Sequence, residues 1–381
     1  MDNWGVRKMA DKKKIVFLGF LPGFGGAERS MIMTANALAN LGYDVTIISF
    51  KDNNVVYEIN RNVNYIFIPD CGGSKIKKQL WRFRNLKDKL SHIKPEVVIS
   101  FWLQPAIFSA ILSKFVGFKV IYSERGDPTD EEYKGILGFI RNIFFNFIDG
   151  FVFQTEGAKK CFSESIQKRG VVINNPVYIK YDDFPIPVKR RKVIVNVGRL
   201  HEQKNQILLI NAFAKISNEF SEYNLEIYGQ GELESELKDL IKRLKLEDRV
   251  ILKGTTNNLF AEIFDASLFV LSSNYEGMPN ALMEAMALGI PCISTDCKPG
   301  GVRELIVNGK NGLITSRNSV EELSEAMKYM LDNPEKASLM GKNAKEICKT
   351  HSPDDIFKIW DKFIKKFIRS NKENERVGAE K

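Results

Sequence analysis

Cysteine and histidine are scarce in this sequence, and those present are poorly spaced for metal binding. The 381 residues include five cysteines and three histidines. No two cysteines form a C-x-x-C pair, so we expect no zinc site and no other bound metal. A disulfide framework is not expected in so long a chain, which favours a reducing compartment such as the cytoplasm.

The sequence also lacks long hydrophobic runs and internal repeats. Val97–Ser113 carries no charge, but Gln104-Pro105 divides it, and it is shorter than the roughly 20 apolar residues that a membrane span needs. We therefore expect a strand and a buried helix there. Near the N-terminus, Ile15–Phe20 follows three lysines and is too short for the core of a signal peptide, so we interpret it as a first buried strand. Without repeats, a solenoid or a propeller is not expected.

Positive charge exceeds negative charge, with a formal net charge of +9. Much of the excess lies in Lys75–Lys94, where the only carboxylate is Asp88. Trp81, Phe83 and other apolar side chains are interleaved with the cations, which indicates an amphipathic helix able to lie on an anionic membrane surface. The alternative is a solvated helix whose Trp81 and Phe83 pack on their own domain. No nucleic-acid-binding motif accompanies the charge, so we expect no nucleic-acid partner.

Short apolar strands alternate with helical segments along the chain, which predicts parallel sheets with helices on both faces. The polar stretch Tyr178–Lys192 interrupts the alternation, which then restarts. Two such units in tandem predict two doubly wound domains that face a cleft, with ligands at the carboxyl ends of the strands. The expected strands are Ile15–Phe20, Val45–Phe50, Val97–Phe101, Val120–Ser123, Gly150–Gln154, Val193–Val197, Leu225–Tyr228, Val250–Lys253, Leu268–Ser272 and Cys292–Thr295.

Three strand-to-helix turns carry glycines or cations that suit a phosphorylated ligand. Gly25-Gly26-Ala27-Glu28 precedes a helix, where glycine permits close backbone approach and the N-terminal amides favour anions. Gly198-Arg199-Leu200 is followed by Lys204, and this pair of cations suits a diphosphate. Gly229-Gln230-Gly231 also lies between a strand and a helix. Taken singly, each motif is also explained by a tight turn or by solvated loop cations.

The strongest motif is Ser272–Met286, with Glu276 in a loop and Glu284 in the helix that follows. Pro279 is well placed as the first residue of that helix. The amides from Met278 to Ala281 would then favour a phosphate, and the two carboxylates, which only accept hydrogen bonds, suit vicinal hydroxyls. The alternative for Glu284 is a surface glutamate. Its apolar neighbours predict a largely buried helix instead, and a buried charge needs a partner or a role.

Together these motifs resemble those of glycosyltransferase family 4, which contains retaining GT-B glycosyltransferases. Glu276 and Glu284 have seven residues between them and match the family's E-x7-E pattern. Within the family, the chain looks like bacterial enzymes that build surface polysaccharides or lipid-linked oligosaccharides. The resemblance extends from about Lys14 to Phe367. Its other landmarks are Gly25–Glu28, Ser123–Pro128, Asn174–Pro176, Gly198–Leu200 with Lys204, Ser294–Cys297 and Asn308–Leu313.

The resemblance implies an α/β fold of the GT-B type. Two Rossmann-like doubly wound domains would face a cleft, and a C-terminal helix would cross back to the first domain. The first domain would bind the acceptor and the second the nucleotide sugar. The expected parts are a first domain over 1–177, a linker over 178–192, a second domain over 193–352, the crossing helix over 353–370 and a tail over 371–381.

The resemblance also implies roles for individual residues. Arg199 and Lys204 would hold the donor diphosphate and stabilise it as the leaving group. Glu284 would bind the ribose hydroxyls, and Glu276 would contact hydroxyls of the donor sugar. No metal would be needed. The nucleotide sugar would be a substrate, so no other cofactor is expected. The further donor-binding positions implied are Gly25, Gly26, Gly198, Gly229, Gly231, Lys253, Met278, Pro279, Asn280 and Ala281.

One departure from the family pattern concerns the first domain. Many relatives carry a histidine there that reaches the donor sugar, but this chain reads Tyr122-Ser123-Glu124-Arg125. Glu124 is the candidate for a substitute role in catalysis, in contact with the sugar or the acceptor. Its alternative is a structural pair with Arg125 or another nearby cation.

The expected activity is retaining transfer of a hexose or N-acetylhexosamine from UDP-Gal, UDP-GalNAc or UDP-GlcNAc. The expected acceptor is a polyprenyl-diphosphate-linked glycan. The protein would then act in the cytoplasm or on the inner face of the cytoplasmic membrane, held there by Lys75–Lys94. Two alternatives stay open. One is a family 4 transferase or phosphorylase with a soluble acceptor, and the other is a non-catalytic nucleotide-sugar-binding partner of a synthesis complex.

Overall fold

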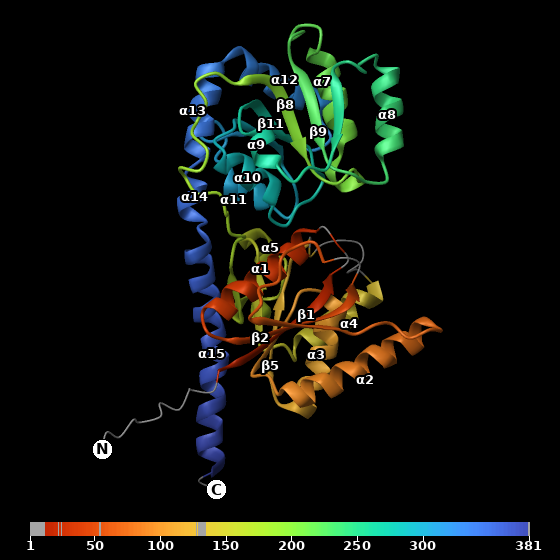
Figure 1. Cartoon of the computed structure of the whole chain (residues 1–381), viewed down its shortest axis with the longest axis vertical. Coiled ribbons are helices and arrows are strands. Elements are labelled where there is room, and N and C mark those ends of the chain that lie inside the picture. Colours follow the sequence, from red (N-terminus) through yellow and green to blue (C-terminus); the bar gives the residue numbers. More distant parts are fainter. Residues whose placement is uncertain are drawn as a thin grey trace, which may run out of the picture.

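The chain forms two parallel sheets, each covered by helices on both faces (Figure 1). The structure is a computed structural model, and it describes residues 12–21, 23, 25–52, 55–126, 128 and 135–379. The strands are β1 (Lys14–Leu21), β2 (Asp44–Asp52), β3 (Val63–Phe67), β4 (Val97–Ser100), β5 (Lys119–Ser123), β6 (Gly150–Phe153) and β7 (Gly170–Val172) in the first domain, and β8 (Arg191–Val197), β9 (Asn224–Tyr228), β10 (Val250–Gly254), β11 (Ala266–Leu271), β12 (Cys292–Thr295) and β13 (Leu313–Thr315) in the second.

Helices connect the strands and form the outer layers. Those of the first domain are α1 (Gly26–Asn40), α2 (Lys75–Ile93), α3 (Leu103–Val116), α4 (Gly135–Phe145), α5 (Glu156–Lys160) and α6 (Glu164–Lys168). The remainder of the chain holds the 3-10 helix η2 (Glu202–Lys204) and the helices α7 (Gln206–Ile216), α8 (Glu234–Arg243), α9 (Leu259–Ile263), α10 (Asn280–Ala287), α11 (Gly301–Leu305), α12 (Val320–Asp332), α13 (Pro334–Ala344), α14 (Ile347–Thr350) and α15 (Pro353–Ala379).

The strand orders are those of doubly wound domains. The first sheet runs β3-β2-β1-β4-β5-β6-β7, and the second runs β10-β9-β8-β11-β12-β13. All strand pairs in both sheets are parallel. In each sheet the order reverses beside the first strand of the domain, which is where such folds bind ligands. The expected two-domain doubly wound architecture is confirmed.

Alternating side chains on β1 show why helices cover both faces of the first sheet. Ile15 and Phe17 point into a core that also holds residues of α1 and α15. Val16 and Leu18 point into the opposite core, against α2, α3 and α4. Because successive strand side chains alternate between faces, a continuous apolar run is buried on both sides. The second sheet is covered in the same way, by α9 to α11 on one face and by α7, α8, α12 and α13 on the other.

The segment expected to be a linker, 178–192, is packed against the second domain. Tyr181 and Phe184 contact its core, and the Lys345 ammonium donates to the Phe184 carbonyl. The Arg190 guanidinium donates to the carbonyls of Phe264, Ala266 and Gly289. The segment is polar in composition, but these contacts bind it to one domain.

Two helix boundaries and three strands differ from the sequence-based expectations. The helix α15 continues to Ala379, beyond the end expected at residue 370, because its lysines, glutamates and arginines are good helix formers. Pro279 is the N-cap of α10 and not its first residue, since its ψ of 99° is extended. The strands β3, β7 and β13 were not expected. Each lies at the edge of a sheet, and β7 and β13 have three residues each, too few for a periodic pattern.

Candidate active site

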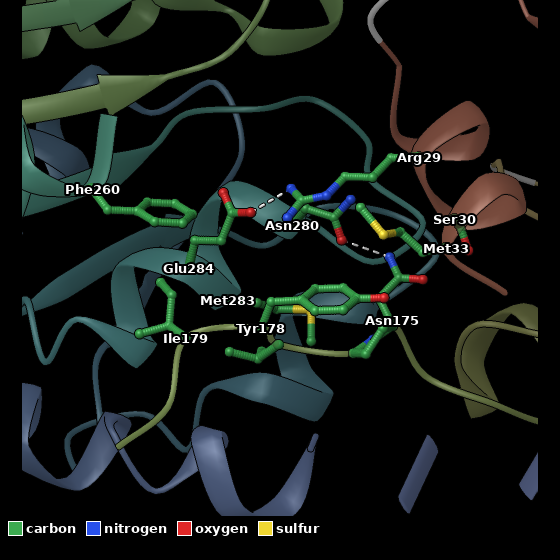
Figure 2. Close-up of a pocket in the computed structure, with 12 residues that line it drawn as sticks. Arg29, Ser30, Met33, Asn175, Tyr178, Ile179, Phe260, Asn280, Met283 and Glu284 are labelled. Atoms are coloured by element: carbon green, nitrogen blue, oxygen red, sulfur yellow. Dashed lines mark hydrogen bonds and ion pairs between the residues drawn. The ribbon is translucent and has the colours of Figure 1, made fainter. Parts of the chain in front are cut away.

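The carboxyl ends of the two sheets face each other, and α1 of the first domain meets α10 of the second. Gly26 lies so close to α10 that a Cβ atom there would be 3.5 Å from Asn280 Nδ2. A small cavity lies at this junction, lined by side chains from both domains that include Arg29, Tyr178, Phe260 and Glu284 (Figure 2). The ends of the strands and the starts of the helices therefore form an interdomain site, as expected for these folds.

Glu284 is paired with a cation from the other domain. The Arg29 guanidinium, on the first turn of α1, donates to Glu284 Oε1 (Figure 2). Burial alone would lower the pKa of Arg29, but the Glu284 carboxylate outweighs burial and raises it. The side chains are only 26% and 14% exposed, so this pair is more strongly coupled than a surface salt bridge. Glu284 is thus a partly buried charge with a partner.

Asn175 makes a second contact between the first domain and α10. Its Nδ2 donates to Asn280 Oδ1 at 2.7 Å and its Oδ1 accepts from Gln154 Nε2 and Arg125 Nη1, both at 3.0 Å. Its backbone amide lies 3.3 Å from the Met278 sulfur. Hydrogen bonds therefore connect Arg125 and Gln154 of the first domain, through Asn175, to the start of α10.

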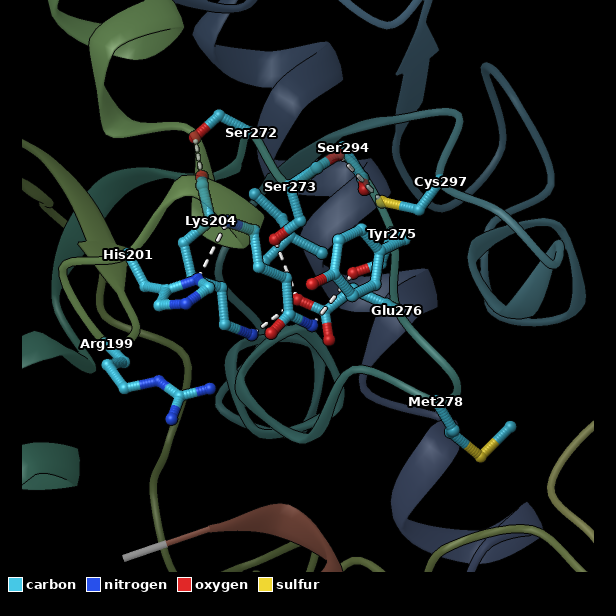
Figure 3. A network of polar contacts seen from close by, with 12 residues as sticks. Arg199, His201, Lys204, Ser272, Ser273, Tyr275, Glu276, Met278, Ser294 and Cys297 are labelled. Carbon is cyan, nitrogen blue, oxygen red and sulfur yellow. Dashed lines mark hydrogen bonds and ion pairs between the residues drawn. The ribbon is translucent and has the colours of Figure 1, made fainter. Parts of the chain in front are cut away.

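Glu276 and Lys204 form the second charged centre, within the second domain (Figure 3). The Lys204 ammonium donates to Glu276 Oε1, and the Ser273 hydroxyl donates to the same oxygen at 2.7 Å. The backbone of the two loops is also joined, because Ser272 Oγ donates to the Lys204 carbonyl at 2.8 Å. The short helix η2 and the loop before α10 are thereby held as one unit, with Lys204 and Glu276 in fixed positions.

Arg199 lies beside this pair and is uncommitted. Its guanidinium makes no hydrogen bond or ion pair with any residue in the described part of the chain, and it is exposed. Figure 3 shows it extended near Lys204 with no contact drawn. Across the interface, burial raises the pKa of Glu28, while a backbone hydrogen bond and the charge of Arg199 act against that rise. An exposed guanidinium next to a lysine is a suitable receptor for a diphosphate.

The glycines of the two neighbouring turns are needed for packing between loops. At Gly229, with φ of 143°, a Cβ atom would lie 2.0 Å from the Gly198 carbonyl oxygen. At Gly231 it would lie 2.1 Å from the Leu200 carbonyl oxygen. At Gly198 it would contact the Lys204 side chain at 3.2 Å. These contacts explain the glycines without a ligand, and their expected approach to the donor stays a prediction.

The start of α10 lies against the first domain. Pro279 caps the helix, Met278 is buried against Asn175, and Ala281 packs on the core of the second domain. The side chain of Asn280 faces Asn175. In contrast, Lys253 is exposed, with its ammonium over the Tyr228 ring at 5.8 Å, and no contact joins it to the charged residues of the site.

The Glu124 carboxylate accepts hydrogen bonds from residues of its own turn. It is 3% exposed and accepts from the amides of Arg125 and Gly126 and from the Tyr122 hydroxyl, each at 3.0 Å. The Arg125 guanidinium lies over the Phe101 ring, 4.9 Å from its centre, and burial lowers the pKa of Arg125 to about 9. The predicted catalytic role of Glu124 stays a prediction.

Arg29 and the role of Asn175 were missed by the reasoning from sequence. The signal for Arg29 was weak but present, because it is a cation directly after the glycine-rich turn, on the first turn of a helix whose start faces the cleft.

Among the residues that the structure describes, no three His, Cys, Asp or Glu side chains are grouped to hold a metal. None of the described helices is both long and apolar enough to span a bilayer.

Two parallel-sheet Rossmann-like domains that face each other form the GT-B fold, which solved glycosyltransferase structures share. The family model "Glycosyltransferase Family 4" matches residues 24–181, and "Glycosyl transferases group 1" matches residues 180–347. The two matches are consecutive and together span most of the chain. The protein therefore belongs to glycosyltransferase family 4, and it is a glycosyltransferase.

Individual proteins agree with this assignment. A Campylobacter jejuni protein named GalNAc-alpha-(1->4)-GalNAc-alpha-(1->3)-diNAcBac-PP-undecaprenol alpha-1,4-N-acetyl-D-galactosaminyltransferase is 27% identical over 92% of this chain and 98% of its own. An uncharacterized glycosyltransferase of Haemophilus influenzae is 26% identical over 92% of this chain and 99% of its own. The crystal structure of Anabaena HepE in complex with UDP and glucose has a TM-score of 0.81 and 19% identity, covering 93% of this chain and 99% of that one.

Proposed function

We propose that this glycosyltransferase moves a hexose or an N-acetylhexosamine, with retention, from a UDP-sugar to a polyprenyl-diphosphate-linked glycan of a surface polysaccharide. UDP-Gal, UDP-GalNAc and UDP-GlcNAc are the proposed donors. The observation that carries the donor half is the uncommitted Arg199 beside the Lys204–Glu276 pair, near the start of α10. The acceptor half is supported by the undecaprenol-linked acceptor in the name of the Campylobacter relative.

In the proposed reaction, Arg199 and Lys204 bind the donor diphosphate. As the bond from the sugar to the diphosphate breaks, negative charge grows on the leaving oxygen, and the two cations stabilise it most at that moment. They also neutralise the diphosphate without a metal, so we propose a metal-independent enzyme. Lys204 then shares its hydrogen bonds between Glu276 and the diphosphate, because an ammonium has three donors.

The two carboxylates divide the remaining donor contacts. Glu276 would accept hydrogen bonds from hydroxyls of the donor sugar, and Glu284 from the ribose. The acceptor hydroxyl attacks on the face from which the diphosphate leaves, and an oxygen of that diphosphate takes its proton. This path retains the configuration at the transferred carbon and needs no separate catalytic base.

The helix α2 supplies a surface for the membrane on which a lipid-linked acceptor resides. Ile76 and Leu80 are 75% and 66% exposed on its outward side. Exposed Lys77, Arg84 and Lys87 are interleaved with them. Apolar side chains that can enter the lipid interface, surrounded by cations that attract anionic headgroups, are the features of an interfacial helix.

Apolar side chains are also exposed on the neighbouring helices. Phe115 at the end of α3 is 72% exposed, and Ile136 and Phe139 on α4 are 75% and 66% exposed. Because α3 packs against both α2 and α4, these side chains belong to one layer of the first domain. Exposed apolar surface of this kind marks an interaction site in a soluble protein. Part of the alternative interpretation also holds, because Phe83 packs on Phe108 with ring centres 5.4 Å apart.

Nucleotide binding tests the proposed donor and its diphosphate site. We expect UDP to bind the purified protein more tightly than GDP or ADP. The double variant Arg199→Ala plus Lys204→Ala should lose roughly 100-fold or more in affinity, because each cation makes a charge-assisted hydrogen bond to the diphosphate. Calorimetry measures both. The double variant Lys242→Ala plus Arg243→Ala, which removes two exposed cations of α8, is the control and should bind UDP normally.

Each outcome assigns the function differently. Equal binding by both double variants would refute the proposed diphosphate site. UDP binding without transfer to any membrane-extracted acceptor would favour a soluble acceptor or a non-catalytic binding role. Transfer that survives removal of divalent cations by a chelator would support the metal-independent reaction, and its loss would refute it.

A further inference from the structure

We propose that Arg29 of the first domain is the positioning residue for Glu284 of the second, so that ribose recognition is complete only when the two domains are in contact. The inference rests on the proposed function, in which Glu284 accepts hydrogen bonds from the ribose. It adds a residue that belongs to the other domain. The donor would therefore be recognised jointly by both domains, although its other expected contacts lie mainly in the second.

The contact is built by the junction of two helices. α1 begins at Gly26, at the face of α10, and Arg29 follows on its first turn. From there the guanidinium reaches Glu284 Oε1, across 255 positions of sequence (Figure 2). Asn280 and Glu284 are one helical turn apart on α10, so both face the first domain. Asn280 receives Asn175, and Glu284 receives Arg29.

The pair leaves room for a hydroxyl. Arg29 occupies Oε1, and Glu284 Oε2 has no hydrogen-bond partner among the described residues. An ionised carboxylate has about four acceptor sites, so it can hold the guanidinium and a ribose hydroxyl together. The Glu284 side chain is 14% exposed, and it borders the interdomain cavity. Arg29 therefore orients Glu284 without filling its acceptor capacity.

Charge gives the reason for such a partner. The carboxylate that binds the ribose would lie close to the donor diphosphate, and two anionic groups at short range repel each other. The Arg29 charge offsets that repulsion and holds the Glu284 carboxylate in place. Asn280, the nearest neighbour on the same face of α10, is neutral and cannot do so. Arg199 lies beside the Lys204–Glu276 pair and makes no contact with Glu284.

The test compares ribonucleotides with 2′-deoxyribonucleotides, because only the ribose hydroxyl differs. Affinities for UDP, GDP and ADP and their 2′-deoxy forms are measured by calorimetry for the wild type, Arg29→Ala, Arg29→Gln, Arg29→Lys and Glu284→Gln. The wild type should prefer the ribonucleotide by about 10-fold or more, as expected for one hydrogen bond to a charged group. Arg29→Ala, Arg29→Gln and Glu284→Gln should reduce that preference to about 2-fold, and Arg29→Lys should restore part of it.

Asn175→Ala is the matched control. It removes the other contact between the first domain and α10 and leaves the Arg29–Glu284 pair in place. We expect its preference for the ribose hydroxyl to stay within 2-fold of the wild type, even if its affinity for every nucleotide falls. Thermal melts of each variant check that it folds.

Four outcomes would overturn the inference. If Arg29 variants lose affinity for both nucleotide forms equally, Arg29 only holds the domains together. If Asn175→Ala lowers the ratio as much as Arg29→Ala, closure in general and not this pair sets the preference. If the wild type binds no nucleotide diphosphate, the proposed function fails together with the inference. Normal binding with an unchanged ratio removes the inference alone.

Discussion

At the scale of single residues, Glu124 shows how burial and hydrogen bonding compete. Three donors surround its carboxylate, and each favours the ionised form. Burial favours the neutral form and outweighs them, so the pKa of Glu124 is raised. Tyr122 and Gly126 therefore hold a carboxyl whose charge is unfavourable in the folded state.

The raised pKa predicts a pH-dependent stability. A carboxyl with a pKa higher in the folded than in the unfolded state contributes stability that is present below the unfolded value, about 4.3, and is lost as pH rises through the folded value. Glu124→Gln is neutral at every pH. We expect its melting temperature, relative to the wild type, to increase by roughly 2 °C or more between pH 5 and pH 8. Scanning calorimetry at several pH values measures the difference. A difference independent of pH would mean that the three donors stabilise the anion fully.

At the scale of the element, α15 joins the two halves of the molecule. It begins after the second domain and packs along the first, against α1 and β4 (Figure 1). Trp360 and Ile364 are buried in the first domain's core, and the Tyr43 hydroxyl donates to Asp361 at 2.7 Å. Gly150 permits the close approach, since a Cβ atom there would lie 2.5 Å from the Phe367 ring. The first domain is thus completed by the last helix of the chain.

Truncating Trp360 measures that completion. The side chain is 1% exposed, so Trp360→Ala leaves a large cavity between α15 and the first sheet. We expect a loss of about 3–5 kcal/mol in the free energy of unfolding of the first domain. Urea denaturation gives the value. Ile359→Ala, at a neighbouring position that is 40% exposed, is the control and should change the free energy by about 0.5 kcal/mol at most.

At the scale of the whole molecule, the first domain presents a basic and apolar surface on the layer formed by α2, α3 and α4. The site lies at the carboxyl edge of the same sheet, where the strands end toward the second domain (Figure 1). An acceptor whose lipid lies in the membrane would then present its glycan to the cleft. The surface and the site lie on different sides of the first domain, because helices cover the faces of a parallel sheet and ligands bind at the ends of its strands.

Vesicle binding tests this surface. The triple variant Lys77→Ser, Arg84→Ser and Lys87→Ser removes three exposed cations from α2, each worth about 1 kcal/mol near an anionic bilayer. We expect co-sedimentation with anionic phospholipid vesicles to fall by 10-fold or more. Arg82 is left intact because it pairs with Asp70 and stacks on Phe50.

The matched control removes three exposed lysines from the second domain. Lys310→Ser, Lys336→Ser and Lys342→Ser makes the same change in net charge, and it should leave vesicle binding unaltered. Equal losses in the two triple variants would mean that net charge alone attracts the protein to the vesicles. Unchanged binding by the α2 variant would contradict the proposed surface.

Much of the fold was predictable because it depends on local pattern. Buried parallel strands are continuous apolar runs, and helices such as α7 have the expected periodicity, so the two-domain architecture followed from the order of segments. Edge strands such as β7 and β13 were missed because neither carries enough residues for a pattern. The sequence therefore determines where most elements lie, and pairing with a neighbouring strand determines where the shortest strands form.

The candidate site divides in the same way. Arg199, Lys204 and Glu276 were identifiable from the sequence because turns at the ends of parallel strands must meet at one edge of the sheet. The pairing of Arg29 with Glu284 was not, because it joins residues 255 positions apart in different domains. Sequence periodicity reports which side of an element is buried. Which charges meet across a cleft depends on how the two sheets are placed relative to each other, and only the tertiary structure decides that.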